Sequence, residues 1–141
     1  MHTPPSFADV DNIPLVTDDA VQDRVATLLE SAMRRQLWLM FLDEESFQLP
    51  LLMPSAIPRH PGNRHTENFA HFIGDLVDEL GCAAVVFILE RPGSDSISTS
   101  DREWLALATV ACQRAGVPLR GPLLCHDGGL RWIGPEDLGQ I

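Results

Sequence analysis

The sequence lacks the long apolar segments of membrane proteins and the leader of secreted ones. No apolar run in its 141 residues approaches the roughly 20 residues that a membrane-spanning helix needs. The first twelve residues, MHTPPSFADVDN, contain neither a basic region nor an apolar core, so they do not resemble a signal peptide. We therefore predict a cytoplasmic protein that does not bind membranes.

Basic residues are also scarce. Lys and Arg together number 10 against 20 Asp and Glu, which gives a formal net charge of −10. A nucleic-acid-binding surface is normally a basic patch, because it must attract phosphates. Here the basic side chains form only small local groups, at 34–35 and in the 59–65 segment. Unaided DNA binding is therefore disfavoured, and another protein or a second copy of the chain is the expected partner.

Cysteine occurs only at Cys82, Cys112 and Cys125. An odd number at these spacings fits neither a disulfide framework nor a zinc knuckle. Each cysteine lies among apolar neighbours in a segment expected to be a helix or a strand. We interpret all three as small buried hydrophobic residues in a reducing compartment.

What is present is a regular alternation of helix and strand patterns. The order α-β-β-α-β-α-β-β predicts a single α/β domain over residues 18–141, with a mixed β-sheet flanked by helices. Residues 1–17 are acidic and proline-rich and are expected to form a flexible arm, although Ile13, Leu15 and Val16 could dock. The expected helices cover 18–35, 67–80 and 101–115, and the expected strands cover 37–42, 47–53, 82–89, 117–126 and 130–134.

The ends of these elements have local signals. Thr17 or Asp18 is expected to cap the first helix, whose last turn would hold Arg34 and Arg35. Pro50 predicts a bulge or an edge in the second strand. Two further caps are expected, Thr66 before the second helix and a capping box, Ser100-x-x-Glu103, before the third.

Taken in order, several segments resemble one known family. They are LWLMFLDEESFQL, FAHFIGDLVDELGCAAVVFIL, RPGSDSISTSD and AGVPLRGPLLCHDGGLRWI. They resemble the JAB/MPN metalloprotease-like domain of the RadC family, which belongs to the cytidine-deaminase-like architecture. The resemblance covers roughly residues 20–138 and implies that fold for the whole domain.

The resemblance also implies a zinc site, which this sequence keeps only in part. The family motif is His-x-His-Pro, a loop and Ser-x-x-Asp, where both histidines and the aspartate hold zinc and a glutamate near the first strand acts as general base. Pro92, Ser98 and Asp101 match the motif, but the histidine positions fall on Leu89 and Arg91. Leucine cannot ligate zinc, and a permanently charged arginine repels it. The resemblance therefore implies a degenerate, metal-free copy with no cofactor.

Around the expected glutamate the sequence reads Arg34, Arg35 and Gln36, without an acid. A polar lip remains after the buried strand, and two placements of Arg91 are open. Its side chain either pairs with Asp101, filling the space of the ion, or points into solvent. The lip consists of Glu90, Arg91, Asp95, Ser98 and Asp101, with Cys125 and His126 as further candidates.

Other groups offer weaker alternatives. His60, His65 and His71 are spaced by five and six residues, which does not place them on one helix face as a metal motif would. His126 is expected to be hydrogen-bonded at a strand end. Cys125 would be a reactive thiolate only beside a cation, for which Arg91 or Arg120 would have to serve.

Three functions follow as hypotheses. The preferred one is a catalytically inactive domain that acts as a protein-binding or scaffold module, with Trp38, Trp104 and Trp132 as candidate anchors. The second is a hydrolase with a non-standard metal or nucleophile near Asp101 and Cys125. The third, a DNA-repair-associated role, comes only from the name of the family that the sequence resembles.

Overall fold

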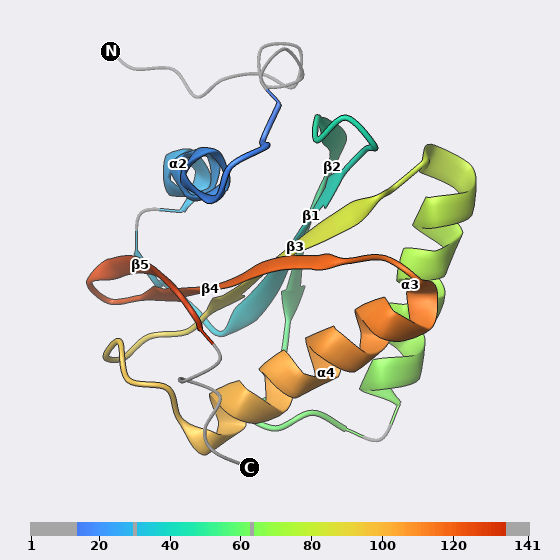
Figure 1. Ribbon diagram of the computed structural model, residues 1–141. Helices are drawn as coiled ribbons and strands as arrows, with labels where there is room; N and C mark the ends of the chain where they lie inside the picture. Colours follow the sequence, from blue (N-terminus) through green and yellow to red (C-terminus); the bar gives the residue numbers. More distant parts are fainter. Residues whose placement is uncertain (1–13, 30, 63, 135–141) are drawn as a thin grey trace.

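The computed structural model describes residues 14–29, 31–62 and 64–134 (Figure 1). In this part of the chain, three helices and five strands follow one another in the order that the sequence indicates. The helices are α2 (Asp18–Leu28), α3 (His65–Leu80) and α4 (Thr99–Ala115). The strands are β1 (Gln36–Leu42), β2 (Gln48–Ala56), β3 (Ala84–Glu90), β4 (Leu119–His126) and β5 (Gly129–Trp132).

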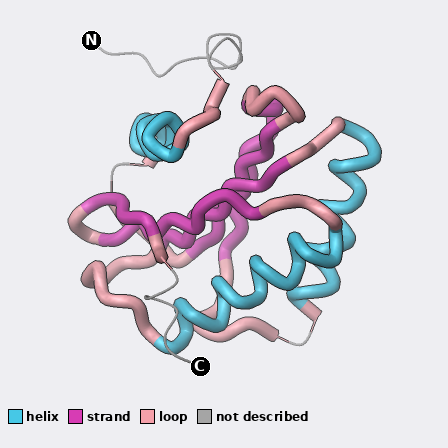
Figure 2. Tube along the Cα trace, viewed as in Figure 1, coloured by secondary structure: helices cyan, strands magenta, loops and turns pink. Residues whose placement is uncertain are grey.

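The strands form one mixed sheet in the order β2-β1-β3-β4-β5 (Figure 2). β3 and β4 are parallel and are connected through α4, whereas the other neighbouring pairs are antiparallel. This arrangement confirms the expected mixed sheet with helices on its faces. It also places the end of β3 beside the start of β1, because Glu90 pairs with Gln36.

Two apolar cores lie on the two faces of the sheet. All seven residues of β3 are buried; the apolar character of the first six predicts this, whereas the last is the charged Glu90. Val85, Phe87 and Leu89 belong to the core under α3 and α4. Val86 and Ile88 belong to the second core, which α2 covers. Successive side chains of a strand point to opposite faces of the sheet. The two residues at the end of β3, Glu90 and Arg91, therefore lie on opposite faces as well.

Helix α2 is shorter than its sequence pattern predicts. It ends at Leu28, and Leu29 already has extended backbone angles. Met33, which lies within the predicted helix, is outside α2 and 80% exposed. The cause is a distant side chain, because the Glu90 carboxylate accepts hydrogen bonds from the backbone N–H groups of Met33 and Arg34. These N–H groups would have to bond within the helix if it continued.

The observed capping residue is the predicted one for α2 but not for α3 and α4. Thr17 caps α2 by accepting a hydrogen bond from the backbone of Ala20. The expectation for Thr66 was wrong, since α3 begins at His65 without a side-chain cap. The capping box of α4 is formed by Ser98 and Asp101, not by Ser100 and Glu103.

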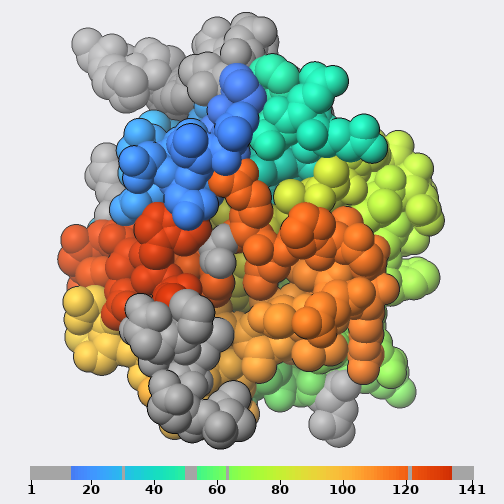
Figure 3. Space-filling model, viewed as in Figure 1, coloured from blue at the N-terminus to red at the C-terminus, as the bar shows by residue number. Residues whose placement is uncertain are grey.

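Residues 14–17 are held against the domain, while Ile13 and the rest of the expected arm lie outside the described residues. Leu15 is 1% exposed in the core under α2, and its N–H donates to the Ser46 carbonyl at 2.7 Å. Arg120 of β4 donates to the carbonyls of Leu15 and Val16. In the space-filling view this segment, in blue, lies against the β1–β2 turn and the start of β4 (Figure 3).

Strand β2 lies at one edge of the sheet and contains two prolines, Pro50 and Pro54. The pairing of β1 and β2 is irregular between Met40 and Leu42, next to Pro50, so the expected bulge or edge is confirmed. Proline has no backbone N–H and is tolerated in sheets only at such positions.

Two further expectations concern burial and membranes. The three cysteines are free and buried, as expected. Within the described part of the chain, none of the helices has the length and apolar character that crossing a bilayer would require.

Candidate functional site

The end of β3 places two opposite charges on opposite faces of the sheet. Glu90 is the last residue of the strand and is 2% exposed on the face covered by α2. Arg91 follows it, is 5% exposed, and lies on the face covered by α3 and α4. Burying a charge is costly unless it is paired and hydrogen-bonded, so each of these side chains must have partners.

Arg91 pairs with Asp101, which resolves the two alternatives left open by the sequence. The Nη2 atom of Arg91 donates to Oδ2 of Asp101 at 2.9 Å, and Nε lies 3.2 and 3.3 Å from the two carboxylate oxygens. The exposed fractions of the two side chains are 6% and 0%. This is a buried, fork-shaped arginine–carboxylate pair, the geometry in which such pairs are strongest.

Asp101 also closes the first turn of α4. Its carboxylate accepts the backbone N–H of Ser98 at 2.9 Å, while the Ser98 hydroxyl accepts the backbone N–H of Asp101 at 3.1 Å. Burial alone would raise the pKa of Asp101, but the hydrogen bonds from Arg91 and Ser98 outweigh it and lower the pKa below its ordinary value. The carboxylate is therefore ionised and fully engaged at neutral pH.

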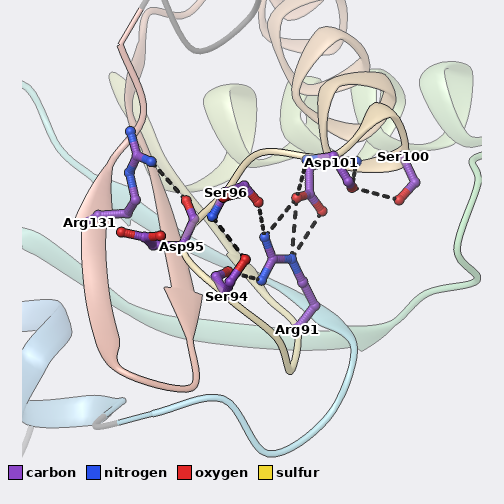
Figure 4. A network of polar contacts seen from close by, with 8 residues as sticks. Arg91, Ser94, Asp95, Ser96, Ser100, Asp101 and Arg131 are labelled. Atoms are coloured by element: carbon purple, nitrogen blue, oxygen red, sulfur yellow. Dashed lines mark hydrogen bonds and ion pairs between the residues drawn. The ribbon is translucent and has the colours of Figure 1, made fainter.

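Arg91 organises the loop between β3 and α4 as well. Its Nη1 donates to the Ser94 carbonyl and its Nη2 donates to the Ser96 carbonyl at 2.7 Å. Figure 4 shows the guanidinium lying between these carbonyls and the Asp101 carboxylate. Gly93 has a φ of +124°, and a side chain there would come within 3.3 Å of Nη1. The loop thus folds around the guanidinium.

On the other face, Glu90 collects four N–H donors. Oε2 accepts the backbone N–H groups of Met33 and Arg34, and Oε1 accepts the side chains of Gln36 and Trp38, both at 2.8 Å. Burial would raise the pKa of Glu90, but the hydrogen bonds, that of Trp38 foremost, lower it below its ordinary value. This role of Glu90 could not be predicted from the sequence, because its donors lie more than fifty residues earlier.

A groove of about 500 Å³ opens beside this carboxylate. Apolar side chains of Leu28, Leu29, Met33 and Trp38 line it together with Arg34 at its polar side. Leu28 is 36% exposed and Met33 80%, so apolar surface remains accessible at the rim. Of the three tryptophans considered as anchors, Trp38 faces this groove.

The expected polar lip is divided rather than assembled. Glu90 and Cys125 belong to the face under α2, whereas Arg91 and Asp101 belong to the opposite face. Pro92 and Asp95 are exposed, and the backbone carbonyl of Asp95 accepts a bond from Arg131 at 2.8 Å. The sheet itself separates the charged groups that the sequence places side by side.

Cys125 and His126 have structural surroundings. Cys125 is fully buried, and burial together with the nearby Glu90 raises the pKa of its thiol to about 11. The two arginines that could activate it, Arg91 and Arg120, are bonded to Asp101 and to the backbone of residues 15–16. His126 accepts the N–H of Gly128 at 3.1 Å, which confirms the expected strand-end role.

The three histidines between residues 60 and 71 have separate partners. His60 lies 2.5 Å from Glu103, and His71 lies 3.7 Å from Asp75 on the exposed side of α3. His65 accepts the N–H of Gly62, and its ring centroid lies 5.0 Å from that of Trp104 at a tilt of 53°. Among the described residues, no group of three or more metal-ligating side chains converges.

The zinc ligand set that the resemblance implies does not fit the side chains at this site. Leu89 is fully buried in the core under α3 and α4 and has no donor atom for a metal. Arg91 brings a cation to within 2.9 Å of the one carboxylate that matches the motif. The Asp101 oxygens already accept hydrogen bonds from Arg91 and Ser98.

No protein-family model matches the chain, and no curated protein compared with it matches either.

Removing the Arg91 side chain should destabilise the protein strongly. We expect Arg91→Ala to lower the free energy of unfolding by about 3–5 kcal/mol, because Asp101 would remain buried without its counter-charge. The double variant Arg91→Met/Asp101→Leu should recover much of this loss. Urea denaturation measures both, with the exposed Arg114→Ala, expected to change stability by less than about 0.5 kcal/mol, as control. A loss below about 1 kcal/mol for Arg91→Ala would contradict the pair's importance.

Both buried carboxylates should make stability depend on acid. Their folded-state pKa values lie below the ordinary 3.8 of Asp101 and 4.5 of Glu90, so their stabilisation is complete above these values and is lost as pH falls through the folded pKa. We expect the stability difference between the wild type and Asp101→Asn to be largest above about pH 5 and to shrink on acidification. The exposed Asp78→Asn is the matched control. A difference independent of pH would show that Asp101 is not ionised in the fold.

Proposed function

We propose that this chain is a degenerate RadC-like JAB/MPN domain that has no hydrolase activity and works by binding another protein. The observation that supports the proposal is the placement of Arg91. Its side chain stands where the resemblance puts a zinc histidine, and it is bonded to Asp101, the one ligand position that remains. A positively charged side chain in this place supports a structural role for the end of β3 instead of a catalytic one.

Two groups near this pair are candidate nucleophiles among the described residues, Cys125 and Ser98, and both have structural contacts. The thiol of Cys125 stays protonated at neutral pH because its pKa is raised to about 11, and a thiol reacts through its thiolate. The Ser98 hydroxyl accepts the N–H of Asp101 in the capping box, which is its function at the helix start. These contacts favour the binding module over the hydrolase alternative.

The groove beside Glu90 is the surface that we expect a protein partner to contact. Met33 is 80% exposed, yet its backbone is fixed because its N–H donates to Glu90 at 2.7 Å. Fixing the backbone of an apolar residue before binding reduces the entropy lost on association. Methionine suits such a surface because its flexible thioether adapts to the shape of a partner.

The first test concerns the metal. We expect the purified protein to hold far less than one zinc ion per chain after exposure to zinc and dialysis, and its melting temperature to be unchanged by zinc or chelator. A metal bound to the folded state at a hundred times its Kd would add about 2.7 kcal/mol of stability. Stoichiometric zinc, or melting that responds to chelator, would contradict the proposal.

The second test concerns binding, for which a second copy of the chain is the partner at hand. We expect sedimentation measurements across a concentration series to show reversible self-association that Met33→Ser weakens. Val110→Ser is the matched control, because Val110 is an exposed apolar residue on α4 with 37% exposure. Identical monomeric behaviour of all three proteins at high concentration would exclude self-association through this groove.

A further inference from the structure

A second arginine lies next to the Arg91–Asp101 pair. Gln36 of β1 pairs with Glu90 of β3. The residues that follow this pair outward, Arg35 and Arg91, are therefore neighbours on adjacent segments of the chain. Arg35 comes two residues before Leu37, so its side chain lies on the same face of the sheet, the one that α3 and α4 cover. Like charges in such cross-strand positions destabilise a sheet unless a counter-charge is present.

A third arginine approaches from the segment after β2. Trp104 of α4 donates its indole N–H to the carbonyls of Pro58 and Arg59, both at 3.1 Å. Trp104 comes three residues after Asp101 and so lies on the same side of the helix. This bond ties the Arg59 backbone next to the first turn of α4, while the Arg59 side chain is exposed.

The charges in this cluster do not balance. Arg35 lies within electrostatic range of three charged side chains, those of Arg59, Arg91 and Asp101, of which only Asp101 is negative. The pKa of Arg35 is lowered by burial and by the two other arginines, against the opposing effect of Asp101. Glu103, a further acid on the first turns of α4, is bonded to His60.

Arg35 also has an unused donor. Its Nη1 atom is the one buried side-chain nitrogen or oxygen in the described residues that has no hydrogen-bond partner. Leaving a buried donor unpaired costs about 1–3 kcal/mol, and more for a charged group. Arg91 cannot relieve this excess, because its own N–H groups are directed at Asp101 and at the loop carbonyls.

We propose that Arg35 and Arg59 bind the phosphate group of a small molecule beside the Arg91–Asp101 pair. Guanidinium groups match phosphate oxygens with paired hydrogen bonds. Among the described residues neither Arg35 nor Arg59 forms an ion pair, so two guanidinium groups have no carboxylate partner. A phosphate group carries about −1.5 to −2 at neutral pH, whereas a carboxylate would neutralise only one of them. Arg35 is half-buried and must turn its Nη1 outward on binding, and the exposed Arg59 completes the site. Arg91 positions the site and does not contact the ligand. The proposal stands apart from the function proposed above.

The experiment uses inorganic phosphate and the whole chain. Thermal unfolding is followed in a buffer without phosphate or sulfate, with phosphate added against sodium chloride at equal ionic strength. The melting temperature of the wild type should rise saturably with phosphate, and titration calorimetry should give the Kd. Arg35→Gln should bind at least ten times more weakly, whereas Arg114→Gln, which removes the same charge from an exposed site at the far end of α4, should bind like the wild type.

The unliganded variants supply a second criterion. Without phosphate, Arg35→Gln should melt at or above the temperature of the wild type, because it removes a like charge and an unpaired buried donor. If Arg35→Gln folds poorly, Arg59→Gln tests the site instead, because it changes an exposed side chain. Arg59→Gln is also expected to weaken phosphate binding. Glycerol phosphate binding more tightly than inorganic phosphate would point to a phosphate monoester as the ligand, and the reverse order to free phosphate.

Two results would overturn the proposal. One is a wild type whose melting temperature responds to phosphate no more than to sodium chloride at the same ionic strength. The other is equal phosphate binding by the wild type, Arg35→Gln and Arg59→Gln. Acetate matching phosphate in affinity would also count against it, because the charge argument favours a doubly charged ligand.

Discussion

The ion pair between Arg91 and Asp101 holds together three parts of the chain that meet at one end of the sheet. Arg91 leaves the buried centre strand, Asp101 begins α4, and the loop between them is folded around the guanidinium through the Ser94 and Ser96 carbonyls. The same carboxylate caps the helix by accepting the N–H of Ser98. Because two fully buried charges are involved, neither can be changed alone without leaving the other uncompensated.

A second buried charge, next along the chain, has the same character on the opposite face. Glu90 binds the backbone at residues 33–34 and two side chains of β1, and it thereby fixes where α2 ends and where the groove begins. Each charge is satisfied by neutral N–H or C=O groups or by an opposite charge. Glu90, Arg91 and Asp101 are all engaged in this way, which leaves these three groups little capacity to exchange protons or to attack a substrate. This is why we favour recognition over chemistry for them.

Local patterns predicted most of the fold, and distant contacts account for what they missed. The apolar run of β3 and the C-terminal ends of α3 and α4 could be predicted, because they depend on neighbours in sequence. The early end of α2 was not, because it depends on Glu90, which lies far ahead in the chain. The sequence allowed two placements of Arg91, paired with Asp101 or pointing into solvent. Only the folded loop, whose carbonyls bind the guanidinium, decides between them.

Overlapping sequence signals explain why the wrong capping box was predicted for α4, and strand register explains why the nearness of Arg35 to Arg91 was not predicted. Two serine-x-x-acid patterns begin within three residues, at Ser98 and Ser100, and only the contact of Asp101 with Arg91 selects the first. The closeness of Arg35 to Arg91 depends on how β1 pairs with β3, which no single segment reveals. The cluster of arginines therefore emerges only when strands distant in sequence are aligned.

The prolines of β2 have a consequence for how the molecule can meet others. Two of the nine residues of that strand offer no amide hydrogen, and at the opposite margin β5 is only four residues long. Neither margin is a good template for the lateral addition of a foreign strand, which is the common route to uncontrolled polymerisation of sheet proteins. The helical layers and the groove are therefore better surfaces for a partner protein than the two edges of the sheet.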